Sequence, residues 1–337
     1  MILFTFIPLI RRDHWTFRIF EFPRFQKWVI NVAILVTYLL VTSLSGTFNW
    51  WLVGLLFINF GYLSFQIYPY LPFAPKQIQT ALAHQEPDIK ILIANVFQDN
   101  KDFEKLNNLV HEKDADIVLL VETNKWWKEK CLEGFGDKYE NRMLEDKENT
   151  YGMLFFSKFP LFNNKVRYLI KDKIPSIVTE VTLGNKRKIK FFALHPEPPV
   201  PTENTHSTDR DAEILLVGKE VEKEKSPLIV AGDLNDVAWS YSSTLFQKIS
   251  GLLDPRRGRG FFSSFHAKYA FFRWPLDHIF CSGHFRVHQI QRLRNIGSDH
   301  FPIFISLHLT PFEDDSKKLV ADAENKKLAD EKIEKAL

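Results

Sequence analysis

Hydrophobic and polar positions follow two different patterns along this chain, and the pattern changes near residue 86. Between Trp28 and Pro75 there is no Lys, Arg, Asp or Glu. Two apolar stretches, WVINVAILVTYLLVTSL and WWLVGLLFINFGYLSFQIY, flank a short polar break at Ser43–Asn49. Since about 20 apolar residues cross a bilayer as a helix, and Trp and Tyr favour its edges, we expect two transmembrane helices over residues 28–71. The alternative, a buried hairpin of a soluble protein, is disfavoured by so long a charge-free run.

The segments around this hairpin indicate its orientation. Two spans return the chain to its starting side, so the basic and apolar segment 1–27 and everything after Pro75 share one face of the membrane. Segment 1–27 has an excess of basic residues over Asp13 and Glu21, which favours the cytoplasmic face: Arg11, Arg12, Arg18, Arg24 and Lys27. Residues 72–86, rich in proline at their start, are interpreted as a linker.

After Glu86, short apolar strands alternate with amphipathic helices. The strands are expected at 90–97, 116–123, 151–157, 177–183, 188–195, 227–233, 276–281 and 302–309. One helix is expected at 100–114 behind an Asn100 cap, and another begins near Thr208. Many strands with few helices predict an α/β domain over residues 87–311 in which two sheets pack together with helices outside. The charge-mixed tail 312–337 is expected to be an exposed helix without chemistry.

Composition excludes some classes of protein. The formal charge of +3, from 44 basic and 41 acidic side chains, is close to balance, so this is no polybasic coat for nucleic acid. Cys131 and Cys281 cannot form a disulfide framework and lack the spacing of a metal site.

Polar side chains recur where the expected strands end. They are Asn95, Glu122, His195, Asp233 with Asn235, Asp277, and Asp299 with His300. One such residue is explained by a turn, but the repetition indicates a common rim. Carboxylates, an amide and two imidazoles suit metal-assisted hydrolysis of a phosphate ester. Zinc is disfavoured because neither cysteine is placed to help and there is no closely spaced histidine pair.

Two of these segments carry a family resemblance. GDLND (232–236) and SDHFP (298–302), within residues 90–309, resemble the endonuclease/exonuclease/phosphatase superfamily, which includes repair nucleases, pancreatic-type deoxyribonucleases, sphingomyelinases and inositol polyphosphate phosphatases. With the hairpin ahead, the chain looks like the membrane-anchored bacterial members, which implies the bacterial inner membrane. The resemblance also implies a four-layered α/β sandwich and Mg²⁺-dependent cleavage of phosphoester bonds, with Mn²⁺ as a possible substitute.

The resemblance assigns the metal and the attacking water to one part of the rim. It implies that Glu122 binds the metal, that Asn95 assists at the metal or phosphate, and that Asp299 reaches the same region. It also implies that Asp233 orients or deprotonates water and that Asn235 binds the phosphate. One departure is Phe97, where several nucleases have a polar residue, so a second metal ligand from that strand is in doubt.

The two histidines are the remaining members of the implied site. His300 would donate to the pentacovalent phosphate or transfer a proton, with Asp277 fixing its tautomer and raising its pKa. His195 would protonate the leaving oxygen. The pancreatic-type nucleases pair the latter histidine with a glutamate that is missing here, and Glu148 or Glu197 are the substitutes to consider.

Substrate choice is expected to depend on residues 254–278, where basic and aromatic residues alternate. Arg256, Arg257 and Arg259 could hold a nucleic-acid strand or a lipid headgroup, or the segment could be an ordinary strand pair with a solvated arginine turn. The sequence therefore predicts a membrane-tethered, Mg²⁺-dependent phosphodiesterase, acting as a nuclease or on phospholipid. The alternative from another class is a catalytically silent scaffold that keeps the fold for binding.

Overall fold

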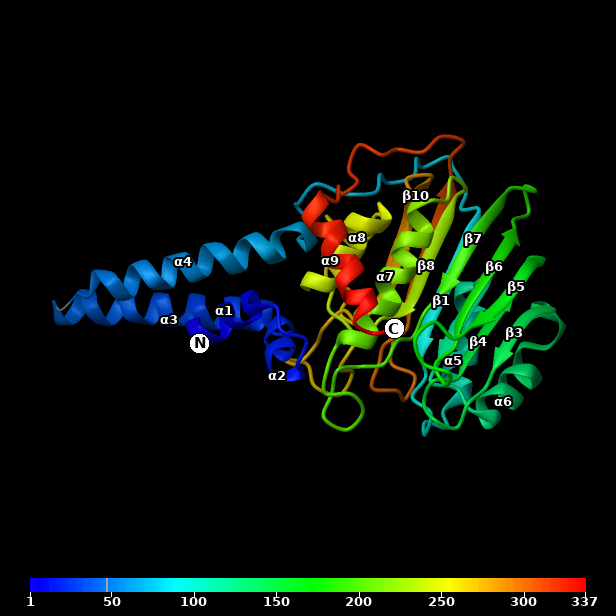
Figure 1. Ribbon diagram of the computed structural model, residues 1–337, viewed down its shortest axis with the longest axis horizontal. Helices are drawn as coiled ribbons and strands as arrows, with labels where there is room; N and C mark the ends of the chain where they lie inside the picture. Colours follow the sequence, from blue (N-terminus) through cyan, green and yellow to red (C-terminus); the bar gives the residue numbers. More distant parts are fainter. Residues whose placement is uncertain (47) are drawn as a thin grey trace.

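Two β-sheets packed face to face form the centre of the computed structural model, which describes residues 1–46 and 48–337 (Figure 1). The first sheet has the strand order β10-β11-β1-β2-β4-β3 and the second β5-β6-β7-β8-β9. Only β1 with β2 and β7 with β8 pair in parallel among the described strands; the other neighbours are antiparallel. The strands of the first sheet are β1 (Ile89–Asn95), β2 (Ile117–Val121), β3 (Asn141–Glu145), β4 (Met153–Ser157), β10 (Phe285–Arg292) and β11 (Ile303–Leu309). Those of the second are β5 (Leu161–Arg167), β6 (Ser176–Thr182), β7 (Lys188–Ala193), β8 (Leu228–Asp233) and β9 (Asp277–Cys281).

The central strands are apolar on both faces because each face is covered. In β1, Ile91 and Ile93 belong to the core between the sheets, whereas Leu92 and Ala94 pack under the outer helices. Helices α5 (Phe103–Lys113) and α6 (Lys125–Phe135), followed by η4 (Gly136–Tyr139), cover the first sheet. Helices α7 (Thr208–Glu222) and α8 (Tyr241–Ser250) cover the second. The predicted α/β sandwich with helices outside two sheets is confirmed.

The elements agree with the sequence pattern in part. All eight expected strands form, but β3, β5, β10, α6 and α8 were not expected. The edge strands β3 and β5 carry few apolar residues, so their pairing depends on neighbours in the sheet. Asn100 forms a turn ahead of α5, where its side chain accepts a hydrogen bond from the Asp102 amide, so the expected cap lies two residues early.

The C-terminal helix differs from the exposed tail that was expected. Helix α9 (Ala323–Glu334) lies against α7 and α8 (Figure 1). Ala329 and Ile333 are buried there with Leu215, Leu245 and Ile249. Most residues of the tail are polar or charged, so its composition alone does not reveal this apolar stripe. The tail is therefore part of the packed structure.

The N-terminal region forms a helical hairpin that projects from one side of the sandwich (Figure 1). Its elements are α1 (Ile2–Phe6), η1 (Ile7–Ile10), α2 (Trp15–Arg18), η2 (Ile19–Glu21), α3 (Arg24–Ser45), α4 (Trp50–Ile67) and η3 (Tyr68–Tyr70). Segments Arg24–Ser45 and Trp50–Tyr70 are long and apolar enough to cross a membrane. Between them, the expected polar break 43–49 includes residue 47, which lies outside the described residues. Asn31 joins the two helices by donating to Leu56 O and accepting from Asn59 Nδ2.

The segment expected to be a linker packs against the domain. Ala74, Gln77 and Ile78 are buried, and the Gln77 side chain accepts a hydrogen bond from the Asp254 amide at 2.8 Å. Thr80 forms an isolated bridge with Val287 at the edge of the first sheet. The hairpin and the sandwich are thus joined by packed chain along 72–80 instead of by a free tether.

Candidate active site

Polar side chains from both sheets meet at one rim of the sandwich. The parallel pairs place the carboxyl ends of β1, β2, β7 and β8 at this rim, where the antiparallel strands β9 and β11 begin. Pairing of β8 with β9 puts Asp233 directly opposite Asp277. Asn95 ends β1, Glu122 follows β2, and His300 precedes β11. The common rim expected from the sequence is present.

Asn95 holds two carboxylates in place. Its Nδ2 lies 2.6 Å from Glu122 Oε1 and 3.0 Å from Asp233 Oδ2. Its Oδ1 accepts a hydrogen bond from the Phe97 amide at 3.0 Å. In this arrangement Asn95, which was expected to assist at the metal or phosphate, orients the acidic groups of both sheets while its oxygen accepts a hydrogen bond from the backbone.

His300 lies between two carboxylates. Its Nδ1 is 2.8 Å from Asp277 Oδ2, and its Nε2 is 3.6 Å from Asp233 Oδ2. Burial lowers the pKa of His300, but the charges of Asp277 and Asp233 outweigh burial and raise the pKa to about 10. The ring is therefore an imidazolium at neutral pH, with Asp277 fixing its orientation.

Several residues that contact His300 and Asp277 or their neighbours were not predicted from the sequence to do so. Ser298 Oγ donates to Asn95 O at 2.8 Å and accepts from the His300 amide at 2.9 Å. Ser264 Oγ accepts from the Asp277 amide at 3.1 Å, and the Phe265 ring centroid lies 4.9 Å from that of His300. Ser298 stands beside two candidate residues in SDHFP, so the motif contained a signal. Ser264 and Phe265 lie in an irregular loop within residues 254–278, a segment that the sequence indicated for substrate contact and not for support of His300.

The loop after β8 presents Asn235. Its backbone N–H donates to Asp233 Oδ1 at 2.9 Å, and its Nδ2 donates to Pro196 O at 2.9 Å. Asn235 has a left-handed backbone with φ of 50°. Gly232, at φ of 144°, allows β8 to approach β7, because a Cβ there would lie 1.9 Å from Leu194 O. The glycine of GDLND is thus required by close backbone contact.

His195 reaches the rim without the acidic partner considered for it. It is buried beside Tyr151, with ring centroids 5.4 Å apart, and burial lowers its pKa to about 4. Its Nδ1 has no hydrogen-bond partner among residues 1–46 and 48–337. Glu197 instead accepts from Lys171 and Asn204, and Glu148 Oε1 accepts from the Lys125 amide. His195 is therefore a neutral imidazole at the site.

The rim geometry agrees with a comparison of sequence families. The model of the Endonuclease/Exonuclease/phosphatase family matches residues 92–300. The chain belongs to this family. None of the curated protein sequences searched matches the chain.

Solved structures of the endonuclease/exonuclease/phosphatase fold resemble the sandwich. A family member from Beutenbergia cavernae has 14% identity and a TM-score of 0.54, covering 66% of this chain and 72% of its own. A mannosyl-6-phosphatase from Bacteroides thetaiotaomicron has 17% identity and a TM-score of 0.51, covering 66% and 100%. TDP2 from D. rerio, complexed with a single-strand DNA product, has 14% identity and a TM-score of 0.54, covering 65% and 98%. At these identities the likeness shows the shared fold.

Members of the family generally depend on divalent metal, and the acidic side of the rim fits such an ion. Burial raises the pKa of Glu122 to about 7, and the nearby charges of Asp233 and Asp299 add to this effect. Asp233, Asp277 and His300 also place ligand atoms within 4.8 Å of one another, but Asp277 and His300 are already bonded to each other. The side of the rim with Glu122 and Asp299 therefore suits a hard cation better.

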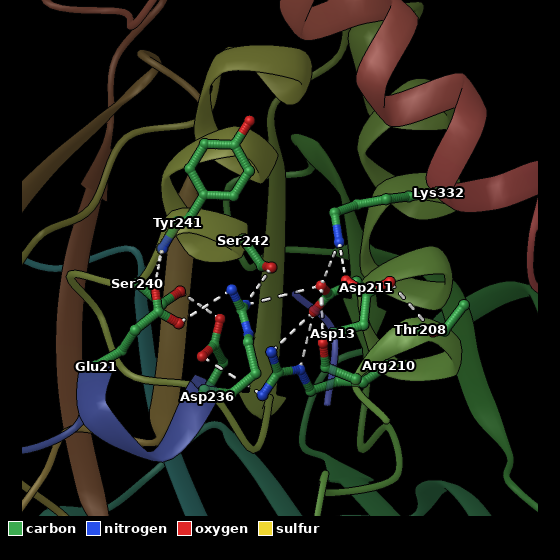
Figure 2. Close-up of polar contacts among 12 residues, drawn as sticks. Asp13, Glu21, Thr208, Arg210, Asp211, Asp236, Ser240, Tyr241, Ser242 and Lys332 are labelled. Atoms are coloured by element: carbon green, nitrogen blue, oxygen red, sulfur yellow. Dashed lines mark hydrogen bonds and ion pairs between the residues drawn. The ribbon is translucent and has the colours of Figure 1, made fainter. Parts of the chain in front are cut away.

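Behind the Asn235 loop lies a buried charge network (Figure 2). Its members are Asp13, Arg18, Glu21, Arg210, Asp211, Asp236 and Lys332. Arg210 Nη1 donates to Asn235 O at 2.7 Å and lies 3.4 Å from Asp236 Oδ1. Asp236 also accepts from the hydroxyls of Ser240 and Ser243, so it anchors the start of α8.

Asp211 is the centre of this network. Its Oδ1 is 2.8 Å from Arg210 Nη2, and its Oδ2 is 3.0 Å from Lys332 Nζ and 3.7 Å from Arg18 Nη2. Arg18 in turn lies 3.1 Å from Glu21. Since Arg18 belongs to α2 and Lys332 to α9, both ends of the chain contact the helix that supports the Asn235 loop.

The three arginines expected to bind substrate are engaged in contacts within the protein. Arg256 is 2% exposed, pairs with Asp254 at 2.8 Å and contacts His278 Nδ1 at 2.8 Å. Arg259 Nη2 donates to Ile78 O, and Arg257 lies over the Tyr70 ring. Their contacts hold the 254–260 turn to the base of the hairpin. Arg256 in particular is enclosed in the core and has no path to a substrate phosphate.

Proposed function

We propose that this chain is a membrane-tethered, metal-dependent hydrolase of phosphodiester bonds, with Mg²⁺ as the cation and Mn²⁺ as a substitute. The observation that carries the proposal is the His300 ring held between Asp277 and Asp233, close enough to the Glu122 carboxylate for their charges to interact. An imidazolium beside buried acids supplies a proton donor, a base and a cation site within one rim.

The side chains divide the chemistry between them. Asp233 orients and deprotonates the attacking water; burial raises its pKa, but the positive charge of His300 and hydrogen bonds from the Asn95 side chain and the Asn235 backbone outweigh burial and lower the pKa. His300 donates from Nε2 to a phosphate oxygen, and Asp277 holds its Nδ1–H. Asn235 and the neutral His195 donate hydrogen bonds to the phosphate and the leaving oxygen. Glu122 and Asp299 would hold the cation, which would supply positive charge to offset that of the phosphate.

The hairpin is proposed as the tether, in the inner membrane of a bacterium. The positive charges that support a cytoplasmic domain are now fewer, because Arg18, Arg24 and Lys27 are buried in protein contacts. Arg11 and Arg12 remain exposed beside the hairpin base and favour the cytoplasmic face. A phosphatase reporter fused after Leu337 is expected to be inactive. A reporter that becomes active in the periplasm would reverse the orientation, and a full chain that stays soluble without detergent would remove the tether.

The activity is tested with the full chain in detergent and a generic soluble phosphodiester such as bis(p-nitrophenyl) phosphate. Hydrolysis is expected with Mg²⁺ and is expected to stop when a chelator is added. Equal hydrolysis with chelator would contradict the metal-dependent mechanism. A folded protein that hydrolyses no phosphate ester with either Mg²⁺ or Mn²⁺ would favour the silent scaffold instead.

A further inference from the structure

We infer that the irregular loop Ser264–Arg273, here called the aromatic loop, rests in the membrane interface and brings the active site to phosphodiesters of lipids in the same bilayer. This inference rests on the proposed function and names its substrate class. It depends on three observations: contacts of the loop with the site, contacts with the hairpin, and exposed rings between them.

One part of the aromatic loop forms a wall of the active site. The Phe265 ring packs 4.9 Å from His300. The Ala267 amide donates to Asp299 O at 2.6 Å, and Ser264 O accepts from the Phe301 amide at 2.8 Å. Any displacement of this part of the loop therefore changes the surroundings of His300 and Asp299.

Another part of the loop is attached to the beginning of the first apolar helix. Gln26, in the first turn of α3, donates from Nε2 to Phe271 O at 2.7 Å. Beside it, Trp274 stacks edge-on against Phe22 at 5.6 Å, and Phe261 contacts Phe25 at 5.3 Å. Since α3 begins at Arg24, the loop lies at the level where the candidate span leaves the protein.

Between these contacts the loop exposes large rings. Tyr269 is 59% exposed, and Phe271 and Phe272 are each 53% exposed. Exposed apolar side chains also occur on the N-terminal segment next to the hairpin, namely Leu3, Leu9, Ile10 and Ile19. Neighbouring exposed rings and aliphatic groups are costly in water but stable at the headgroup level of a bilayer, where aromatic residues gather.

The domain cannot turn freely to move this loop away from the membrane. The buried charge network fixes α2 to α7 and α9 (Figure 2). On the other side of the hairpin, the Tyr70 hydroxyl donates to Ala238 O at 2.5 Å, and the Gly258 amide donates to Pro69 O at 2.8 Å. Both ends of the hairpin are thus fixed to the sandwich, so a bilayer around α3 and α4 holds the site at one height and one angle.

This fixed position favours lipid over nucleic acid as the substrate. Lipid phosphates lie at the headgroup level, where the aromatic loop meets the span. A nucleic-acid strand would have to approach an anionic membrane surface, which repels its phosphates. The balanced net charge of +3 offers little to offset this repulsion.

The position of the loop is tested by site-specific labelling in vesicles. Cys131 and Cys281 are both buried, so a Phe272→Cys variant of the full chain can be labelled selectively with an environment-sensitive fluorophore. Phe162→Cys, on the edge strand β5 and 49% exposed, is the matched control. Spin-labelled lipids in phosphatidylglycerol–phosphatidylethanolamine vesicles are expected to quench the label at 272 and not at 162. A label at 272 that stays unquenched in reconstituted protein would overturn the inference.

The substrate class is tested on the same vesicles. The reconstituted protein is expected to cleave the vesicle phospholipid faster than single-stranded DNA. The double variant F271S/F272S is expected to lose about tenfold on vesicle lipid because two rings no longer reach the interface. Phe162→Ser is the control and is expected to match the parent protein on every substrate.

The outcomes separate the inference from the proposed function. Preference for DNA, or an equal loss by F271S/F272S on vesicle lipid and on bis(p-nitrophenyl) phosphate, would overturn the inference while leaving the phosphodiesterase intact. A chain that hydrolyses none of the three substrates would instead remove the proposed function. Unchanged melting of the variants, both of which alter exposed residues, excludes misfolding as the cause of a loss.

Discussion

At the scale of single residues, the site depends on which groups share protons and which are held in place. His300 and Asp277 form one unit, because a single hydrogen bond sets the orientation of the ring and its charge. Asn95 has a different task, since it joins a carboxylate of each sheet at distances of 2.6 and 3.0 Å. The two sheets are therefore linked at the rim by side chains as well as by the core beneath them.

Replacement of His300 and Asp277 is expected to show that they act together. His300→Ala and Asp277→Asn should each lower kcat by about 10²-fold or more, because each removes the oriented proton donor. The double variant should be little worse than either single variant, since residues that act as a unit are not additive. Initial rates on bis(p-nitrophenyl) phosphate measure this, with melting curves as the control. Full activity in folded His300→Ala protein would contradict the assigned role.

Glu122→Gln is expected to weaken metal binding. The substitution removes a charged hard ligand while keeping the size of the side chain. The Mg²⁺ concentration for half-maximal activity should rise about tenfold or more, and Mg²⁺ should raise the melting temperature of the variant less than that of the parent. The melting comparison does not depend on turnover. Identical Mg²⁺ dependence of both proteins would place the cation elsewhere.

At the scale of elements, the polar residues at the strand ends could be predicted from the sequence, but the contacts that hold those residues in place could not. A carboxylate at the end or the beginning of an apolar strand is visible in the sequence, so Glu122, Asp233 and Asp277 could be assigned to one rim. The burial of Arg256 could not be predicted from the sequence. It depends on the ion pair with Asp254 and on the part of the chain that folds over Arg256 from the base of the hairpin. Likewise, the sequence could not show that Lys171 and Asn204 direct Glu197 away from a pairing with His195.

Asp211 is expected to be important for stability. Burial raises its pKa, but Lys332, Arg210 and Arg18 outweigh burial and hold the pKa far below its usual range. Asp211→Asn should therefore lower the free energy of unfolding by about 3–5 kcal/mol, since it leaves buried cations without their partner. A group with a lowered pKa contributes stability above the unfolded value of about 4 and loses it as the pH falls further.

Urea unfolding of Asp211→Asn near pH 7 and near pH 3 measures both parts of this prediction. The difference from the parent should be large at the higher pH and smaller at the lower one. Asp330→Asn, which breaks an ion pair of α9 with Lys219 at the surface, is the control and should change little. A difference that does not depend on pH would show that shape, and not charge, accounts for the loss.

At the scale of the whole molecule, the hairpin, the sandwich and the terminal helix are one unit. The N-terminal segment supplies Arg18 and Glu21 to the charge network, and the tail supplies Lys332. A division into anchor, linker and catalytic domain follows from composition, but contacts cross each of these boundaries. Those contacts could not be predicted because they join residues that lie up to 322 positions apart.

Truncation to residues 83–309 is therefore expected to damage the domain. This fragment loses Ile78, Arg18 and Lys332 together, so Asp211 and Asp236 keep only part of their positive partners. We expect it to melt more than about 10 °C below the full chain, or to aggregate. The control keeps residues 11–27 and 68–337 and replaces the hairpin between them with a flexible Gly-Ser segment. The melting temperature of that protein should be close to that of the full chain. If fragment 83–309 were as stable as the full chain, the conclusion that hairpin base, sandwich and terminal helix form one folded unit would be contradicted.

The amide pair Asn31 and Asn59 has a consequence for how the hairpin is made. A lone amide is costly in hydrocarbon, and Asn31 and Asn59 gain these hydrogen bonds only when the two helices lie together in one rotational setting. For the membrane tether proposed above, insertion of the helices one after the other would leave the first amide unpaired in lipid. The pair would therefore favour entry of both helices as a preassembled hairpin. The same relative rotation of the two helices then determines the side of the hairpin on which the sandwich lies after it folds.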